Sequence, residues 1–258
     1  MKLPYRFEVK FGVRCPIGMK SAIEIDRELD ENEKLSTAVG HQRWSKAIKK
    51  EQDKFSEHKA FEFLEEGALP PKGYQKMRCH FVFDVKADGT FKARFVAGGN
   101  SVDATHIHST MSVVETAHTR VLFAIAGANN QTVLIGDLAS AYLHAHTLEK
   151  VFFVCGPEWG IYEGCIAIVI KAVYGLVGSA HAYHRHVFDV MQSLGWKPSD
   201  LDRNIWWRLD KDGVLYDYIA FYVDDFIIVS NHPSSLAEEL GEIFSITSLS
   251  LGQGNWPS

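Results

Sequence analysis

The sequence has no long hydrophobic run. None of its apolar stretches approaches the roughly 20 residues that a membrane-spanning helix needs, so we expect no membrane-embedded segment and no membrane partner. The N-terminal stretch MKLPYRFEVKFG also lacks the apolar core and the small-residue cleavage site of a secretory signal. These absences predict an intracellular protein, located in the cytoplasm or the nucleus.

Several motifs with known chemistry are also missing. The 4 cysteines form no Cys-x-x-Cys pair, so we expect reduced, packed thiols rather than a disulfide framework. The chain contains no Gly-x-Ser-x-Gly turn, no Walker A loop and no Gly-x-Gly-x-x-Gly sequence. Three His-x-His pairs occur without a third ligand at suitable spacing, so a zinc site is not predicted.

Charge of neither sign is in large excess, because 27 basic residues face 32 acidic ones. This mild acidity argues against a protein coated with positive charge for nucleic acid. Between Lys72 and Gly98, however, six basic residues accompany two acidic ones. A local basic arm on an acidic body is compatible with phosphate contact. The same pattern is also compatible with the solvated face of a hairpin.

Hydrophobic periodicity predicts a mixture of helices and strands. Apolar residues alternate from Met77 to Val85, Asp88-Gly89 signals a turn, and Phe91 to Ala97 forms a return strand. Apolar residues at helical spacing predict a helix from Trp44 to about Glu65. Further helices are expected at 116–128 and 176–194, and further strands at 132–135, 151–154, 166–170, 216–223 and 226–229. The mixture predicts an α+β or α/β architecture.

Two adjacent carboxylates, Asp224 and Asp225, interrupt an otherwise apolar β-sequence. Bare charges near a core are costly, and a divalent cation such as magnesium or manganese would offset that cost. Asp137 ends another apolar segment, VLIGD, which a sheet could place beside Asp224. Three carboxylates around two metal ions support in-line phosphoryl transfer. The alternatives are a solvent-exposed Asp-Asp turn and, for Asp137, a helix N-cap.

The order of motifs from Trp44 to Phe244 resembles the reverse transcriptase domain of copia-type retrotransposons. The motifs are GYQKMRCHFVFDVKADGTFKARFVAGG, SVVETAHTR, DLASAYLHA, EKVFFVCGPEWG, KAVYGLVGSA, LGWKPSDLDRNIWW and YVDDFIIV. The resemblance implies an α+β fold with the fingers and palm of a right-hand polymerase, an antiparallel palm sheet backed by helices, and a thumb that is largely missing. It divides the chain into a divergent leader (1–40), a fingers-like region with the hairpin (41–130), a palm (131–246) and a truncated tail (247–258).

The resemblance implies an RNA-directed DNA polymerase that adds deoxynucleotides to a primer. Asp137, Asp224 and Asp225 resemble the catalytic aspartates, which would bind two Mg²⁺ or Mn²⁺ ions. The implied partners are an RNA or DNA template with its primer, deoxynucleoside triphosphates, and other domains of a retroelement polyprotein.

Three further residues match nucleotide-binding positions of that family. Tyr142, five residues after Asp137, resembles an aromatic gate that would clash with a ribose 2′-hydroxyl. Lys92 and Arg94 on the second hairpin strand resemble residues that grip the incoming triphosphate.

The chain also departs from the family pattern. Val177, Gly178 and Ala182 replace residues that are usually basic or polar, and the sequence ends at GNWPS without the segments that build a thumb. Two other interpretations therefore remain. One is an inactive retroelement relic or nucleic-acid-binding fragment, and the other is a different metal-dependent phosphoryl enzyme on a palm-like fold.

Overall fold

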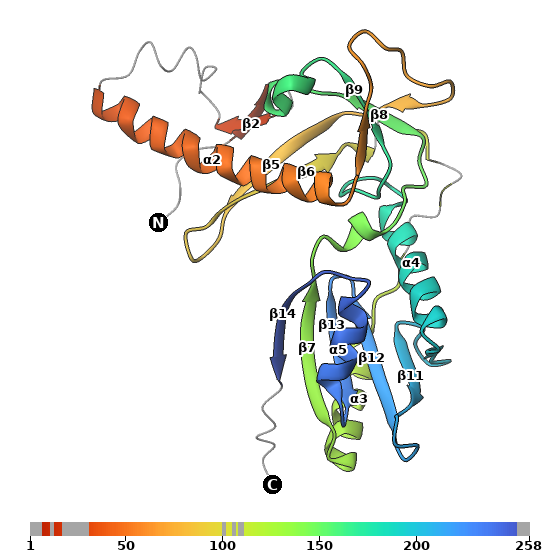
Figure 1. Cartoon of the computed structure of the whole chain (residues 1–258). Helices are drawn as coiled ribbons and strands as arrows, with labels where there is room; N and C mark the ends of the chain where they lie inside the picture. The colour runs from red at the N-terminus through yellow and green to blue at the C-terminus, as the bar shows by residue number, and fades with distance from the viewer. Residues whose placement is uncertain are drawn as a thin grey trace. The chain divides into compact units, whose positions relative to one another are not determined.

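The structure is a computed structural model that describes residues 7–10, 13–16, 31–99, 102–104, 107 and 111–251. The chain forms two compact units (Figure 1). The first unit contains Met1–Ile107 and His146–Ser179, and the second contains His108–Ala145 and Ala180–Ser258. Both units mix helices with strands, which confirms the α+β class. The assignment of fingers and palm stays a prediction.

The first unit contains two four-stranded sheets. One has the strand order β1-β2-β5-β6 and the other β3-β9-β8-β4. The strands of the first sheet are β1 (Phe7–Lys10), β2 (Val13–Pro16), β5 (Cys79–Val85) and β6 (Phe91–Ala97). Those of the second are β3 (Phe61–Phe63), β4 (Gln75–Lys76), β8 (Val151–Val154) and β9 (Ile166–Val169). A short 3₁₀ helix, η3 (Pro157–Tyr162), follows β8.

Strands β5 and β6 form the hairpin that the alternation of apolar residues predicted. They pair antiparallel with Phe83 opposite Ala93. Gly89 has a φ of 80°, a left-handed conformation that glycine adopts without strain, so the turn falls where Asp88-Gly89 indicated it.

Helix α2 (Glu31–Glu57) packs against the hairpin. The ring of Trp44 lies 4.9 Å from that of Phe83, and Phe55 lies 5.6 Å from Phe95. The predicted end of this helix near Glu65 is wrong. The chain leaves the helix at Glu57, and Phe61 starts β3, where its backbone pairs with Val169 of β9. This long-range pairing overrides the helical spacing of the apolar residues.

The predicted leader and tail are described only in part. The described residues of 1–40 contain β1, β2 and the first part of α2. Residues 1–6, 11–12, 17–30 and 252–258 lie outside the described residues. Residues 247–251, which were expected in a truncated tail, belong to the last strand of a sheet.

The second unit is built on one antiparallel sheet of six strands in the order β10-β11-β12-β13-β7-β14. The strands are β7 (Thr132–Leu138), β10 (Lys197–Pro198), β11 (Ile205–Leu209), β12 (Tyr216–Tyr222), β13 (Asp225–Ser230) and β14 (Ile246–Leu251). The helices are α3 (Thr116–Asn129), α4 (Ser179–Ser193) and α5 (Pro233–Gly241). After β7 the chain forms a short 3₁₀ helix, η2 (Ala141–His144).

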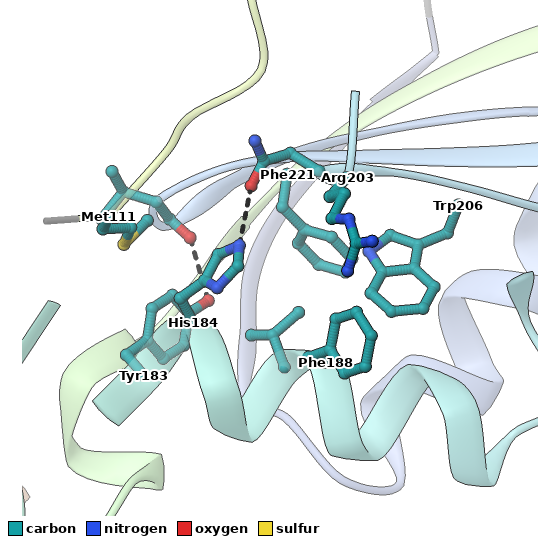
Figure 2. Close-up of a pocket in the computed structure, with 10 residues that line it drawn as sticks. Met111, Tyr183, His184, Phe188, Arg203, Trp206 and Phe221 are labelled. Atoms are coloured by element: carbon teal, nitrogen blue, oxygen red, sulfur yellow. Dashed lines mark hydrogen bonds between the residues drawn. The ribbon is translucent and has the colours of Figure 1, made fainter. Parts of the chain in front are cut away.

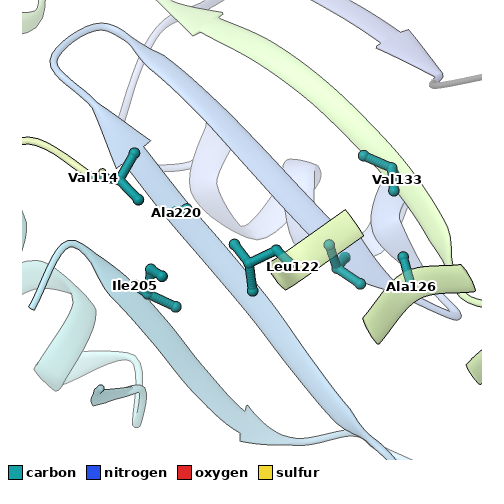
Figure 3. Packing of buried hydrophobic residues seen from close by; sticks show 7 residues of the cluster. Val114, Leu122, Ala126, Val133, Ile205 and Ala220 are labelled. Carbon is teal, nitrogen blue, oxygen red and sulfur yellow. The ribbon is translucent and has the colours of Figure 1, made fainter. Parts of the chain in front are cut away.

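Helix α3 covers part of one face of this sheet. Its Leu122 and Ala126 are buried against Val133 of β7 and Val229 of β13 (Figure 3). Because side chains alternate along a strand, the neighbouring buried residues of β7 and β13 face the other side, where α5 packs (Figure 1). The sheet therefore has a core on both faces. Within the described residues, no helix is both long and apolar enough to cross a membrane.

Candidate active site

Two neighbouring strands of the six-stranded sheet bring the acidic residues together. Strands β7 and β13 pair antiparallel, and their register places Asp137 directly opposite Asp225. Residues opposite each other in such a pair share a face, with Cβ atoms about 5 Å apart. Asp224 lies in the two-residue turn between β12 and β13, next to Asp225. The structure thus gathers the three aspartates at one end of the sheet.

The turn that carries Asp224 has an unfavourable backbone conformation. Val223 has a φ of 57°, a left-handed conformation that a β-branched residue rarely adopts. Two hydrogen bonds fix this turn. The Tyr183 hydroxyl donates to the Val223 carbonyl at 2.9 Å, and the Leu138 amide donates to the Asp224 carbonyl at 2.7 Å. These contacts with α4 and β7 hold the acidic turn in a fixed position against the sheet.

The three carboxylates repel one another. Partial burial raises the pKa of Asp225, and the nearby charges of Asp224 and Asp137 raise it further. None of the ion pairs within the described part of the chain involves these three residues. The end of the sheet therefore concentrates negative charge that a bound cation would neutralise.

The donor atoms suit a hard divalent cation in kind, because magnesium and manganese prefer carboxylate oxygens. In the described parts of the chain, no three His, Cys, Asp or Glu side chains converge closely enough to hold a metal ion. The Asp137 carboxylate instead accepts a hydrogen bond from the Thr247 hydroxyl. The residues thus fit a cation by the chemistry of their donor atoms.

Tyr142 lies close to these carboxylates. It is on η2, and its ring packs edge-on against Tyr183 with 5.8 Å between the ring centres. Burial raises the pKa of the Tyr142 hydroxyl, and the charge of Asp224 raises it further. The structure therefore places this predicted nucleotide-binding residue on the same side of the second unit as the acidic turn.

Lys92 and Arg94 lie in the first unit, on β6. They alternate with the buried residues Ala93 and Phe95, so both basic side chains are on the hairpin face that points away from α2. Burial lowers the pKa of Lys92, and the charges of Arg94 and Lys86 lower it further. Lys92 and Arg94 belong to the first unit and the aspartates to the second, and the role of this pair in nucleotide binding stays a prediction.

A small cavity within the second unit is lined by residues that include Val223 of the acidic turn (Figure 2). It has about 290 Å³ of empty space, part of it open to solvent. Its wall includes Tyr183, His184, Phe188, Trp206 and Val223. The His184 ring nitrogen Nε2 is 3.1 Å from the side-chain oxygen of Asn204. Tyr183 therefore both lines the cavity and anchors Val223.

Sequence reasoning missed two residues of the site. Thr247 contacts Asp137 from the last strand, and Gly136 provides the space for the Phe226 ring beside Asp137. The Gly-Asp dipeptide was visible in the sequence, whereas no local pattern marked Thr247.

Comparison with known proteins places these motifs in a family. A sequence family described as reverse transcriptase (RNA-dependent DNA polymerase) matches residues 68–250, more than half of the chain. The transposon Ty1-DR4 Gag-Pol polyprotein of Saccharomyces cerevisiae is 24% identical over 249 residues, covering 94% of this chain and 15% of that polyprotein. A retrovirus-related Pol polyprotein from transposon TNT 1-94 of Nicotiana tabacum is 23% identical, covering 86% of this chain and 17% of its own length.

The chain thus spans only a small part of these relatives. Among solved structures, a foamy viral protease-reverse transcriptase in complex with double-stranded DNA has 13% sequence identity and a TM-score of 0.39, covering 78% of this chain and 30% of that one. The match of the family over most of the sequence confirms the resemblance that the motifs indicated, and the chain belongs to the reverse transcriptase (RNA-dependent DNA polymerase) family.

Proposed function

We propose that this chain is an RNA-directed DNA polymerase domain of a copia-type retrotransposon that adds deoxynucleotides to a primer. The observation that carries the proposal is the register of β7 and β13, which sets Asp137 opposite Asp225 with Asp224 in the adjoining turn. In a member of the reverse transcriptase family, this acidic cluster is the natural place for nucleotidyl transfer.

Each aspartate has a role in this proposal. Asp137, Asp224 and Asp225 would hold two Mg²⁺ or Mn²⁺ ions. These ions would relieve the repulsion that, in addition to burial, raises the pKa of Asp225. When bound, the ions supply charge that favours ionisation of a primer 3′-hydroxyl and departure of pyrophosphate. The protein itself contributes positioning, because the tethered turn and the paired strands fix the backbone of all three aspartates.

Three residues are proposed to bind the incoming nucleotide. Tyr142 would pack under the sugar and exclude a 2′-hydroxyl, and its half-buried ring is supported by Tyr183. Lys92 and Arg94 would bind the triphosphate from the basic hairpin face. The proposed partners are deoxynucleoside triphosphates, an RNA or DNA template with its primer, and other polyprotein domains. The proposed location is the cytoplasm or the nucleus.

Primer extension tests the proposal. The purified chain is given an RNA template with an annealed DNA primer, deoxynucleotides, and Mg²⁺ or Mn²⁺. We expect extension by the wild type, a loss of more than about 100-fold in Asp224→Asn, and no change in Asp200→Asn. Asp200 is a matched control, because it is an exposed aspartate of the same unit that follows the edge strand β10 and belongs neither to β7 nor to the turn before β13.

Two results would contradict the proposal. Equal extension by wild type and Asp224→Asn would show that the cluster is not the catalytic site. No extension by folded wild type would favour the relic or nucleic-acid-binding fragment, and fluorescence anisotropy with a labelled primer–template would then measure whether the chain binds nucleic acid. Cleavage of nucleic acid that is lost in Asp224→Asn would instead indicate a different phosphoryl enzyme.

A further inference from the structure

The edge strand β14 is irregular where it passes the candidate active site. Ile246 pairs with Leu138 of β7, and Ser248 pairs with Asp137, so Thr247 is an extra residue that forms a β-bulge. Bulges alter the direction of a side chain at the point where they occur. At this bulge the Thr247 hydroxyl is directed to Asp137.

The hydroxyl of Thr247 has two acceptors within reach, both on Asp137. One is the carboxylate oxygen Oδ2, and the other is the carbonyl oxygen at 3.2 Å. A threonine hydroxyl has a single proton, and the charged carboxylate is the stronger acceptor. The bond therefore fixes the carboxylate of Asp137 through one oxygen, and the described residues give Oδ1 no hydrogen-bond donor.

The backbone on both sides of this contact is also fixed. The Leu138 amide donates to the Asp224 carbonyl, and the Ala139 amide donates to the Ser245 carbonyl at 2.6 Å. Thr247 and Asp137 thus lie on two paired strands whose relative position is set by main-chain hydrogen bonds. The hydroxyl can then define the orientation of the carboxylate rather than simply follow it.

We propose that Thr247 is a positioning residue for Asp137. Its hydroxyl holds Oδ2 and leaves Oδ1 for a divalent cation shared with Asp224 and Asp225. Carboxylates that bind metals are commonly oriented by hydrogen bonds from residues that do not touch the metal, and loss of such a partner weakens metal binding by about 10–100-fold. The inference rests on the proposed function, because it assumes that Asp137 is a metal ligand.

Titration with Mn²⁺ tests this inference without any measurement of polymerase activity. Free Mn²⁺ is followed by electron paramagnetic resonance in the presence of the whole chain. We expect Thr247→Val to raise the Kd for Mn²⁺ about 10-fold, and Thr247→Ser, which keeps the hydroxyl, to stay within about 2-fold of wild type. Thr132→Val is the matched control, since Thr132 is an exposed threonine at the other end of β7, and it should bind Mn²⁺ like the wild type.

The possible results separate the two proposals. Asp137→Asn must weaken Mn²⁺ binding, and if it does not, both the proposed metal site and the role of Thr247 are wrong. If Asp137→Asn weakens binding but Thr247→Val binds like the wild type or more tightly, only the role of Thr247 is wrong. Near-ultraviolet circular dichroism of each variant checks that the fold is retained, and Thr247→Ser keeps the test valid if Thr247→Val unfolds.

Discussion

Replacement of Gly136 by alanine should destabilise the second unit. A Cβ at this position would overlap the Cζ atom of Phe226, lie 2.6 Å from its Cε1 and lie 3.0 Å from the Cδ2 atom of Leu249. Phe226 is only 1% exposed, so its ring has little room to move. Adding a methyl group to a well-packed core typically costs about 1–3 kcal/mol. We expect Gly136→Ala to lower the free energy of unfolding by that amount.

Chemical denaturation followed by tryptophan fluorescence measures this loss. A matched control is Gly127→Ala in α3, where a Cβ meets nothing within 4 Å and should raise the free energy of unfolding by about 0.5–1 kcal/mol. The same substitution, glycine to alanine, is thus expected to change the free energy of unfolding in opposite directions at two positions of one unit.

A double-mutant cycle identifies the cause of the Gly136 effect. Phe226→Ala alone should cost about 3–5 kcal/mol, because it opens a cavity. In the double variant the added methyl group no longer meets the ring. The double variant should therefore lose less stability than the sum of the two single variants, by about 1 kcal/mol or more. A neutral Gly136→Ala variant, or strictly additive costs, would refute the steric argument.

Two aspartates of the second unit should change the pH dependence of stability in opposite directions. Burial raises the pKa of Asp217, a hydrogen bond from Ser230 opposes this shift, and the charge of Asp210 adds to it. The contribution of Asp217 to stability is therefore lost as the pH rises above the ordinary aspartate range. Asp217→Asn should therefore raise the free energy of unfolding by about 1 kcal/mol at pH 7 and by less at pH 3. A variant that is less stable than the wild type at pH 7 would contradict this. For Asp202, burial raises the pKa, but hydrogen bonds from His118, Asn204 and Glu115 outweigh burial and lower it, so its contribution is present at neutral pH and lost in acid. Asp202→Ala should cost about 1–3 kcal/mol at pH 7 and less at pH 3, measured by denaturation at both pH values, and a cost independent of pH would show that the ionised carboxylate is not responsible.

Features of the fold that depend on local sequence could be predicted. The hairpin of β5 and β6 was predicted because alternation and an Asp-Gly turn are both short-range signals. The position of Asp137 beside the acidic pair was also predicted, because each aspartate ends or follows an apolar strand segment. Antiparallel strands that share one sheet then bring such ends together.

Features that depend on distant pairing could not be predicted. Phe61 has the spacing of a helix, and only its pairing with β9 makes it part of a strand. Thr247 lies 110 residues after Asp137, and its contact depends on the register of β14 and on one bulged residue. A shift by one residue would turn the side chains of β14 to the opposite face, and no pattern in the segment ITSLSL specifies that register.

The acidic turn combines two features that oppose stability. Val223 has a left-handed backbone although its side chain is β-branched, which costs about 1–3 kcal/mol. Beside it, three carboxylates lie close together without an ion pair among the described residues. Partial burial raises the pKa of Asp225, and the charges of Asp224 and Asp137 raise it further. Sequences that specify a fold usually avoid such conflicts except where a site needs them. The strain of Val223 and the uncompensated charge of the three aspartates occur at the same end of the sheet, and α4 and β7 both donate hydrogen bonds to the turn. The local structure therefore favours a binding site for cations over a simple solvent-exposed turn.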